Sequence, residues 1–270
     1  EYHEDWGRIP STDEREAVRE LCSFIFGRQL LLVGYTVYGK NSSLVEEYAC
    51  NPWGNNPKSF CSAPDIPPVR IDDYKLRGKA ESLLNQLLPA YCELRNPLHL
   101  KEALWLYWIS RDMPVGINLP IIAAAVEAIL NGWFEYKKTN SQGIYMNKVE
   151  FDKLLHEEIK VIGNKLKDKT YGKEIFNNIQ NAYRMGVTDR FNAFFKEIGI
   201  DINAQDKDAI ITRHNFAHVR IKFDKTDWKS VIQKAGTYET VFHRVLLKLL
   251  GYSGSYIDRS VIPHSERKLI

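Results

Sequence analysis

From about residue 74 onward, apolar residues recur at helical spacing, and this pattern most constrains the fold. The stretch from Leu119 to Tyr136 is apolar on nearly every side, with Pro120 in its first turn and Glu127 near its middle. A helix that is apolar all round is enclosed by other helices, whereas a surface helix keeps a polar face. We therefore predict an all-α bundle over residues 74–270 with this helix at its centre.

The other helices of the bundle follow from the same spacing and from capping residues. They are expected at residues 76–94, 98–113, 174–185, 188–198, 206–217 and 227–250. Asn147-x-x-Glu150 begins a further helix, which is predicted to carry Phe151 and Leu166 on one face. The last helix is predicted to bury one stripe, formed by Trp228, Val231, Ile232, Ala235, Phe242, Val245, Leu246 and Leu249. No strand is expected beyond about residue 74.

The first 73 residues have a different character. Ser11-x-x-Glu14 is a capping box that begins a helix over 12–26, and Gly27 ends it. Residues 29–38 and 44–50 read as two strands, and the proline-rich segment 51–68 as an irregular connection. The predicted fold is therefore mainly α: a small α/β module over 1–73, followed by an all-α domain over 74–270.

Composition narrows the class of protein only slightly. The chain has 44% apolar residues and a net charge of +3, so it can bury a core and could bind RNA only through a local basic patch. The four cysteines form no C-x-x-C pair, and no secretory leader or apolar run of about 20 residues is present. We expect a soluble cytoplasmic protein with no membrane partner. Because the sequence begins without methionine and soon enters a helix, we also expect it to lack an N-terminal part.

The candidate site is the string Arg213-His214-Asn215-Phe216-Ala217-His218. An arginine stays charged at any working pH and can neutralise a phosphate, while a histidine titrates near neutrality and can move protons at a ribose 2′-OH. These two residue types are the minimal set for RNA cleavage, a reaction that needs no metal or cofactor. Residues five apart on a regular helix lie about 140° from each other. Either the helix ends or bends near Phe216, or two copies of the motif share one cleft.

The string resembles the R-polar-x-x-x-H motif of HEPN ribonucleases. The helix after it runs into Gly251-Tyr-Ser-Gly-Ser-Tyr-Ile-Asp258, which is similar to the tail of the ApeA-like HEPN family of bacterial anti-phage proteins. The similarity also covers residues 100–135 and, more faintly, 26–36. It implies a HEPN-like helical bundle, a homodimer or higher homo-oligomer, and metal-independent cleavage of RNA, with transfer RNA as one candidate. It further implies an N-terminal recognition region and a phage-derived trigger.

The resemblance assigns roles to the motif residues. Arg213 would hold the phosphate and His218 would act as general acid or base, while His214 and Asn215 would support them. Glu127 needs a cationic partner in its apolar helix, either Arg213 or another cation. Basic residues after the motif, including Arg220 and Lys222, could follow an RNA backbone or form a solvated face.

Two other interpretations remain open. Tyr256 could line the cleft and contact RNA, but docking of the tail onto the core is the preferred role. His214 and His218 are four apart and could hold a metal in a hydrolase, although Asn215 replaces the glutamate of the H-E-x-x-H motif and no third ligand is evident. A HEPN domain that binds RNA without cutting it is the main alternative.

Overall fold

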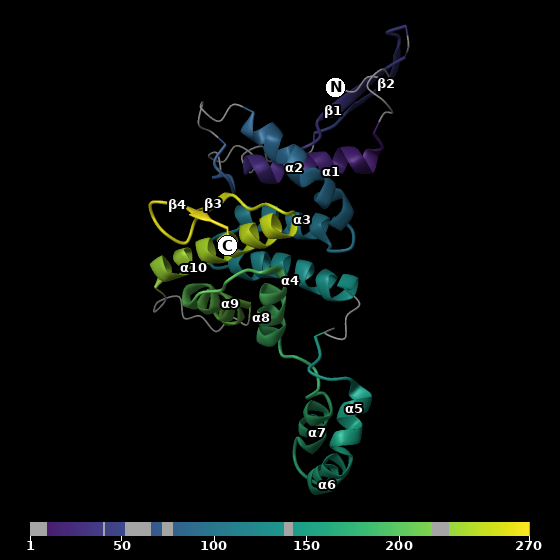
Figure 1. Cartoon of the computed structure of the whole chain (residues 1–270), viewed down its shortest axis with the longest axis vertical. Coiled ribbons are helices and arrows are strands. Elements are labelled where there is room, and N and C mark those ends of the chain that lie inside the picture. Colours follow the sequence, from purple (N-terminus) through teal and green to yellow (C-terminus); the bar gives the residue numbers. More distant parts are fainter. Residues whose placement is uncertain are drawn as a thin grey trace.

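A computed structural model describes residues 10–39, 41–51, 66–71, 78–137, 143–217 and 227–269, the side chains of 213–217 excepted. Most of the described residues are helical, and the remaining regular structure is two small antiparallel hairpins. Figure 1 shows these elements along the long axis of the molecule. The prediction of a mainly α chain is confirmed, while its likeness to the HEPN bundle stays a prediction.

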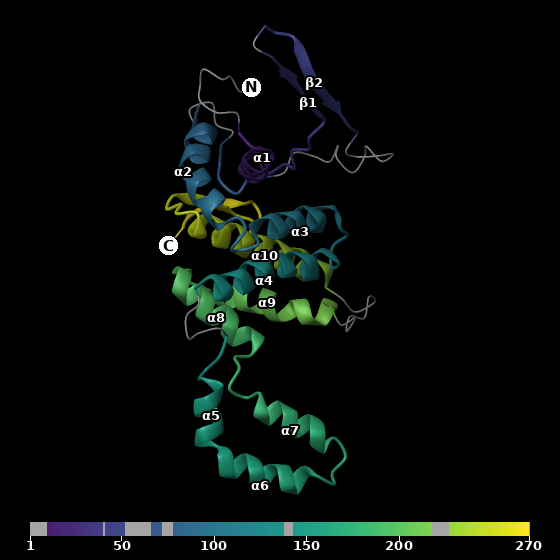
Figure 2. The same cartoon turned by 90° about the vertical axis from the view of Figure 1, so that its right-hand side faces the viewer.

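The centre of the bundle is formed by α4 (Asn118–Lys137) and α10 (Trp228–Leu249). As predicted, α4 is enclosed: it packs against α3 (Leu100–Asp112), α8 (Val187–Ile198), α9 (Ala204–Ala217) and α10. Figure 2 shows α4 and α10 between α3 above and α9 below. Every residue of α10 from 237 to 247 is buried, so this helix is surrounded as well.

The apolar stripe predicted for α10 is only partly buried at its beginning. Trp228 and Ile232 are 37% and 49% exposed, whereas Val231 is buried. Burial in the first turns is restricted to the side of Val231, because neighbouring elements surround the helix only further along its length. Apolar spacing alone could not show where that enclosure begins.

Helix α1 (Thr12–Phe26) has the predicted bounds and caps. Both hydrogen bonds of the Ser11–Glu14 capping box are present, and Gly27 ends the helix with a φ of 63°. Its apolar side chains join the same core as those of the bundle helices. Helix α2 (Lys79–Leu94) packs against α1, and Arg95 directly after it bonds both oxygens of Glu20 at 2.7 and 2.9 Å. The helix of the predicted N-terminal module is thus packed into the bundle core.

The two predicted N-terminal strands are also present. They are β1 (Gly34–Tyr38) and β2 (Leu44–Ala49), which pair antiparallel as a two-stranded hairpin. The hairpin projects from the bundle beyond α1, as both views show, and every residue of β2 is exposed. The connection predicted at 51–68 lies mostly outside the described residues.

Residues 143–186 form an arm of three short helices: α5 (Lys148–Leu154), α6 (His156–Leu166) and α7 (Gly172–Gln180). The prediction of one continuous helix to 166 is wrong, because Leu155 leaves helical geometry with φ −117° and ψ 20°. The two halves face different partners: Phe151 packs against Tyr183, whereas α6 packs against α7, with Gly163 close to Phe176. The helix predicted at 174–185 ends at Gln180.

The C-terminal tail contains strands that the sequence prediction missed. β3 (Ser255–Asp258) and β4 (Ser265–Lys268) pair antiparallel, and β3 packs against α10. β4 is Ser-Glu-Arg-Lys, which shows no apolar alternation, so its conformation comes from pairing with β3 and not from its own pattern. Among the residues that the structure describes, no helix combines the length and apolar character needed to cross a bilayer.

Candidate functional site

The Arg213–His218 motif lies at the C-terminal end of α9. Arg213, His214 and Asn215 belong to the last turns of this helix, and α9 as described ends at Ala217, directly before His218. The side chains of 213–217 and the whole of His218 lie outside the described residues, as do Arg220 and Lys222. Whether Arg213 and His218 converge therefore stays a prediction, but the contacts that position the helix are well defined.

The beginning of α9 is held by two sets of polar contacts. Asn203 and Asp206 cap the helix reciprocally: the backbone N–H of each donates to the side chain of the other, at 3.1 and 2.9 Å. Asp206 also accepts a 2.9 Å ion pair from Arg244 of α10, and both side chains are at least nine-tenths buried. Arg244 donates in addition to the carbonyl oxygen of Asp201. Buried charges paired in this way fix the register of α9 along α10.

The end of α9 that leads into the motif is held by Lys234 of α10. Its Nζ donates to Thr212 Oγ1 at 3.0 Å and forms an ion pair with Asp208 at 3.0 Å. Thr212 is buried, at 8% exposure, and immediately precedes Arg213. A contact at Thr212 restricts the backbone from which Arg213 projects, so Lys234 is well placed to position the motif.

The tail completes this framework. Gln205 of α9 donates to Thr237 Oγ1 of α10 at 3.1 Å and to the carbonyl oxygen of Ser260 at 3.4 Å. The backbone N–H of Arg259 donates to Thr240 Oγ1 at 2.9 Å. The tail is thus tied both to α10 and to the helix that carries the motif.

Tyr256, a candidate RNA contact, is 6% exposed in β3. Its ring lies 5.9 Å from the guanidinium of Arg244, and burial raises the pKa of its hydroxyl. A ring enclosed in this way cannot stack on a base without movement of the tail. Its position supports the docking role that the sequence analysis preferred.

Glu127 is half-buried in α4, a helix that packs against α9. Its predicted pairing with Arg213 or another cation stays a prediction. The packing of α4 against α9 is the structural condition that a pairing with Arg213 would need.

A buried polar cluster that the sequence analysis missed lies between α3, α10 and the tail. Glu239 accepts from Arg259 Nε at 3.1 Å, from the Tyr107 hydroxyl at 3.2 Å, and from Arg111. His243 Nε2 lies 3.0 Å from the same Tyr107 hydroxyl. Glu239 and His243 are one helical turn apart, on either side of the apolar residues Val241 and Phe242, and this spacing is visible in the sequence.

The environment of this cluster keeps His243 neutral. Burial lowers its pKa well below the ordinary value of 6.5, and the charges of Arg259 and Arg111 lower it further. Its Nδ1 has no hydrogen-bond partner among the described residues. A histidine that is fully enclosed in this way cannot reach a substrate, so we assign the cluster to anchoring the tail and α3 on α10.

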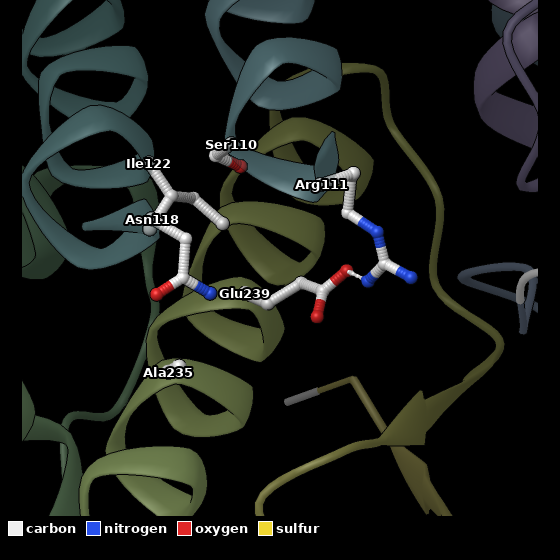
Figure 3. Close-up of a pocket in the computed structure, with 6 residues that line it drawn as sticks. All are labelled: Ser110, Arg111, Asn118, Ile122, Ala235 and Glu239. Atoms are coloured by element: carbon white, nitrogen blue, oxygen red, sulfur yellow. Dashed lines mark hydrogen bonds and ion pairs between the residues drawn. The ribbon is translucent and has the colours of Figure 1, made fainter. Parts of the chain in front are cut away.

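Beside the cluster is a cavity of about 70 Å³. Figure 3 shows Arg111 and Glu239 on one side of it and Asn118 and Ile122 of α4 on the other. Pockets that hold small ligands have about 300–1,000 Å³, so this cavity is too small for a nucleotide. It cannot be the RNA-binding cleft.

A larger hollow of about 430 Å³ lies in the arm, away from α9. Its lining consists of Asp152, His156, Ile159, Lys160 and Gln180. All of these except Ile159 are exposed, and solvent weakens the interactions of exposed charges.

Among the described side chains, no group of three or more histidine, cysteine, aspartate or glutamate residues could hold a metal ion. The side chains of His214 and His218 are outside that set, so the metal alternative also stays a prediction. The sequence matches no model of a known protein family, no curated protein and no solved structure.

Proposed function

We propose that this chain is a metal-independent endoribonuclease of the HEPN type that acts in the bacterial cytoplasm in defence against phage. The observation that carries the proposal is the Arg213–His218 spacing at the end of α9. Thr212, the residue directly before Arg213, is buried and bonded to Lys234. Both residue types that this chemistry needs are present. The resemblance of the motif and tail to the ApeA-like family supports the assignment of substrate and purpose.

In the proposed reaction the ribose 2′-oxygen attacks the adjacent phosphorus and the 5′-oxygen leaves. His218 takes the proton of the 2′-OH, and the partner subunit's His218, in its protonated form, gives one to the leaving oxygen. Arg213 neutralises the charge that builds on the phosphate, with support from His214 and Asn215. The products carry 2′,3′-cyclic phosphate and 5′-OH ends.

The proposed active form is a homodimer or higher homo-oligomer, with two motifs facing one cleft. A single motif supplies one histidine, whereas this scheme needs both a base and an acid, and two copies provide them. Glu127 would orient Arg213, and Arg220 and Lys222 would follow the RNA backbone. The RNA cleaved would be host RNA, with transfer RNA as one candidate, after a phage-derived trigger.

The test is an RNA cleavage assay in EDTA on the wild type, Arg213→Ala and His218→Ala. Each substitution should lower the rate by roughly 10²- to 10⁴-fold, since positioned proton transfer and charge stabilisation contribute on that order. Arg184→Ala and His264→Ala, which remove the same side chains elsewhere, should cut at the wild-type rate. A substrate with 2′-deoxyribose at the cut site should be inert.

Three outcomes would count against the proposal. Loss of cleavage with chelator would favour the metal-dependent hydrolase with His214 and His218. Binding of RNA without cleavage in any state of activation would favour a non-catalytic HEPN domain. Undiminished cleavage by both motif variants would exclude the motif as the active site.

A further inference from the structure

The β1–β2 hairpin is a small element, held across its strands by the stacked rings of Tyr35 and Tyr48. An isolated two-stranded hairpin is at best marginally stable in water, because one pair of strands buries little apolar surface. Here Tyr38, Leu44 and Val45 are 65%, 59% and 65% exposed. Among the described residues, neither strand has a second neighbour. Within the ranges that the structure describes, both edges therefore present backbone groups without a strand partner, beside exposed apolar side chains.

The backbone hydrogen bonds of the hairpin determine which backbone groups point outward. Cys50 N–H donates to the Val33 carbonyl at 2.9 Å, so these two residues are a hydrogen-bonded pair. Hydrogen-bonded and non-hydrogen-bonded pairs alternate along an antiparallel ladder. In the observed register Thr36 lies opposite Glu47, three places along from that first pair. The N–H and C=O of Thr36 therefore point away from β2, and those of Glu47 point away from β1.

The two edges differ in how well they could pair with a copy of themselves. A two-fold axis at Thr36 would place Thr36 opposite its own copy and Tyr35 opposite Val37, pairs that stabilise a sheet. A two-fold axis at Glu47 would place two glutamates directly opposite each other, which destabilises a sheet. Charges also protect edge strands from association, and β1 carries none. Self-pairing is thus favoured on the β1 edge and opposed on the β2 edge.

We propose that β1 is an interface with a second copy of this chain, in which two hairpins join antiparallel about Thr36 into one four-stranded sheet. Thr36 of each chain would donate its N–H to the Thr36 carbonyl of the other, and Gly34 would pair with Tyr38 on either side. Tyr38 and Leu44, which lie directly opposite each other in each hairpin, would then share one face of the sheet with their copies. This contact is separate from the dimer proposed at α9 and does not depend on RNA cleavage.

Proline substitution provides a matched pair of variants. Thr36→Pro removes an N–H that points out of β1 and leaves the bonds within the hairpin, since proline is tolerated where the N–H faces away from the sheet. Glu47→Pro makes the same change at the opposite position on the β2 edge. Molar mass by light scattering and sedimentation equilibrium should show Thr36→Pro at half the mass of the wild type and Glu47→Pro unchanged. The factor of one half applies where β1 is the sole contact between copies. Where the α9 contact forms as well, each chain has two different two-fold contacts, and Thr36→Pro should fall to the mass of the α9 dimer.

A second experiment detects the contact directly, by disulfide cross-linking, and so does not depend on the loss of an interaction. Opposed residues of a hydrogen-bonded pair have Cα atoms about 5.5 Å apart, within the range that a disulfide spans. Thr36→Cys should therefore form a covalent dimer under mild oxidation, while Glu47→Cys should give only the background of the wild-type cysteines. A monomeric wild type, equal masses for wild type and Thr36→Pro, or equal cross-linking at the two positions would each overturn the proposal.

Discussion

The buried ion pair between Asp206 and Arg244 permits a quantitative prediction about the helix that carries the motif. Asp206→Ala removes the acidic partner and leaves the Arg244 guanidinium, 10% exposed, without its carboxylate. It also removes the reciprocal cap with Asn203 at the first turn of α9. Both effects weaken the attachment of α9 to α10.

The magnitude follows from these two losses. Breaking a buried ion pair by removing one partner costs about 3–5 kcal/mol, and loss of an N-terminal cap costs about 1 kcal/mol. Arg244 keeps its bond to the Asp201 carbonyl and its position over Tyr256, which places the first loss at the low end of that range. We expect Asp206→Ala to lower the free energy of unfolding by about 4 kcal/mol.

The assay is urea unfolding followed by far-UV circular dichroism and tryptophan fluorescence. Asp208→Ala is the control: that carboxylate pairs with Lys234 but is 60% exposed, so its removal should cost less than about 1 kcal/mol. The double variant Asp206→Ala with Arg244→Met should be more stable than Asp206→Ala alone, because it no longer buries an unpaired charge. Asp206→Ala within about 1 kcal/mol of the wild type, or a double variant less stable than the single one, would refute the reasoning.

Three further predictions follow from other contacts. On the proposed function, Lys234→Met should lower the rate of RNA cleavage while RNA affinity stays near that of the wild type, because Lys234 contacts Thr212 directly before the motif. Single-turnover kinetics and a binding assay separate the two effects, and an equal loss in Lys234→Arg would contradict the idea. Below about pH 6.5, His243 takes up a proton in the unfolded state but stays neutral in the fold, because burial lowers its pKa. The free energy of unfolding should therefore fall as the pH is lowered, by at most about 1.4 kcal/mol per pH unit. Urea titrations at several pH values should show a smaller dependence on pH for His243→Leu. Gly132→Ala should lower the thermal midpoint markedly, because a Cβ there would lie 2.7 Å from the Cα of Leu98; an unchanged midpoint would contradict the observed approach of α4 to the α2–α3 connection.

Local sequence determined most of the helices and their ends. The capping box at Ser11 and Glu14 and the left-handed Gly27 set both ends of α1, because each satisfies backbone groups within a few residues along the chain. The strong apolar character of α4 likewise predicted its enclosure. These features depend on short-range chemistry that a sequence displays directly.

Tertiary structure decided the elements whose partners are distant in sequence. β4 has no strand pattern of its own and exists through pairing with β3, and the helix predicted to run to residue 166 divides at Leu155, with its two halves packing on different neighbours. The site depends on the fold in the same way. The sequence offered Arg213 and His218 as candidates, but the attachment of α9 through Lys234 and Arg244 comes from α10, 20 to 40 residues further along the chain. Buried polar contacts form only where two elements already approach each other, so spacing along the chain cannot specify which side chains will meet.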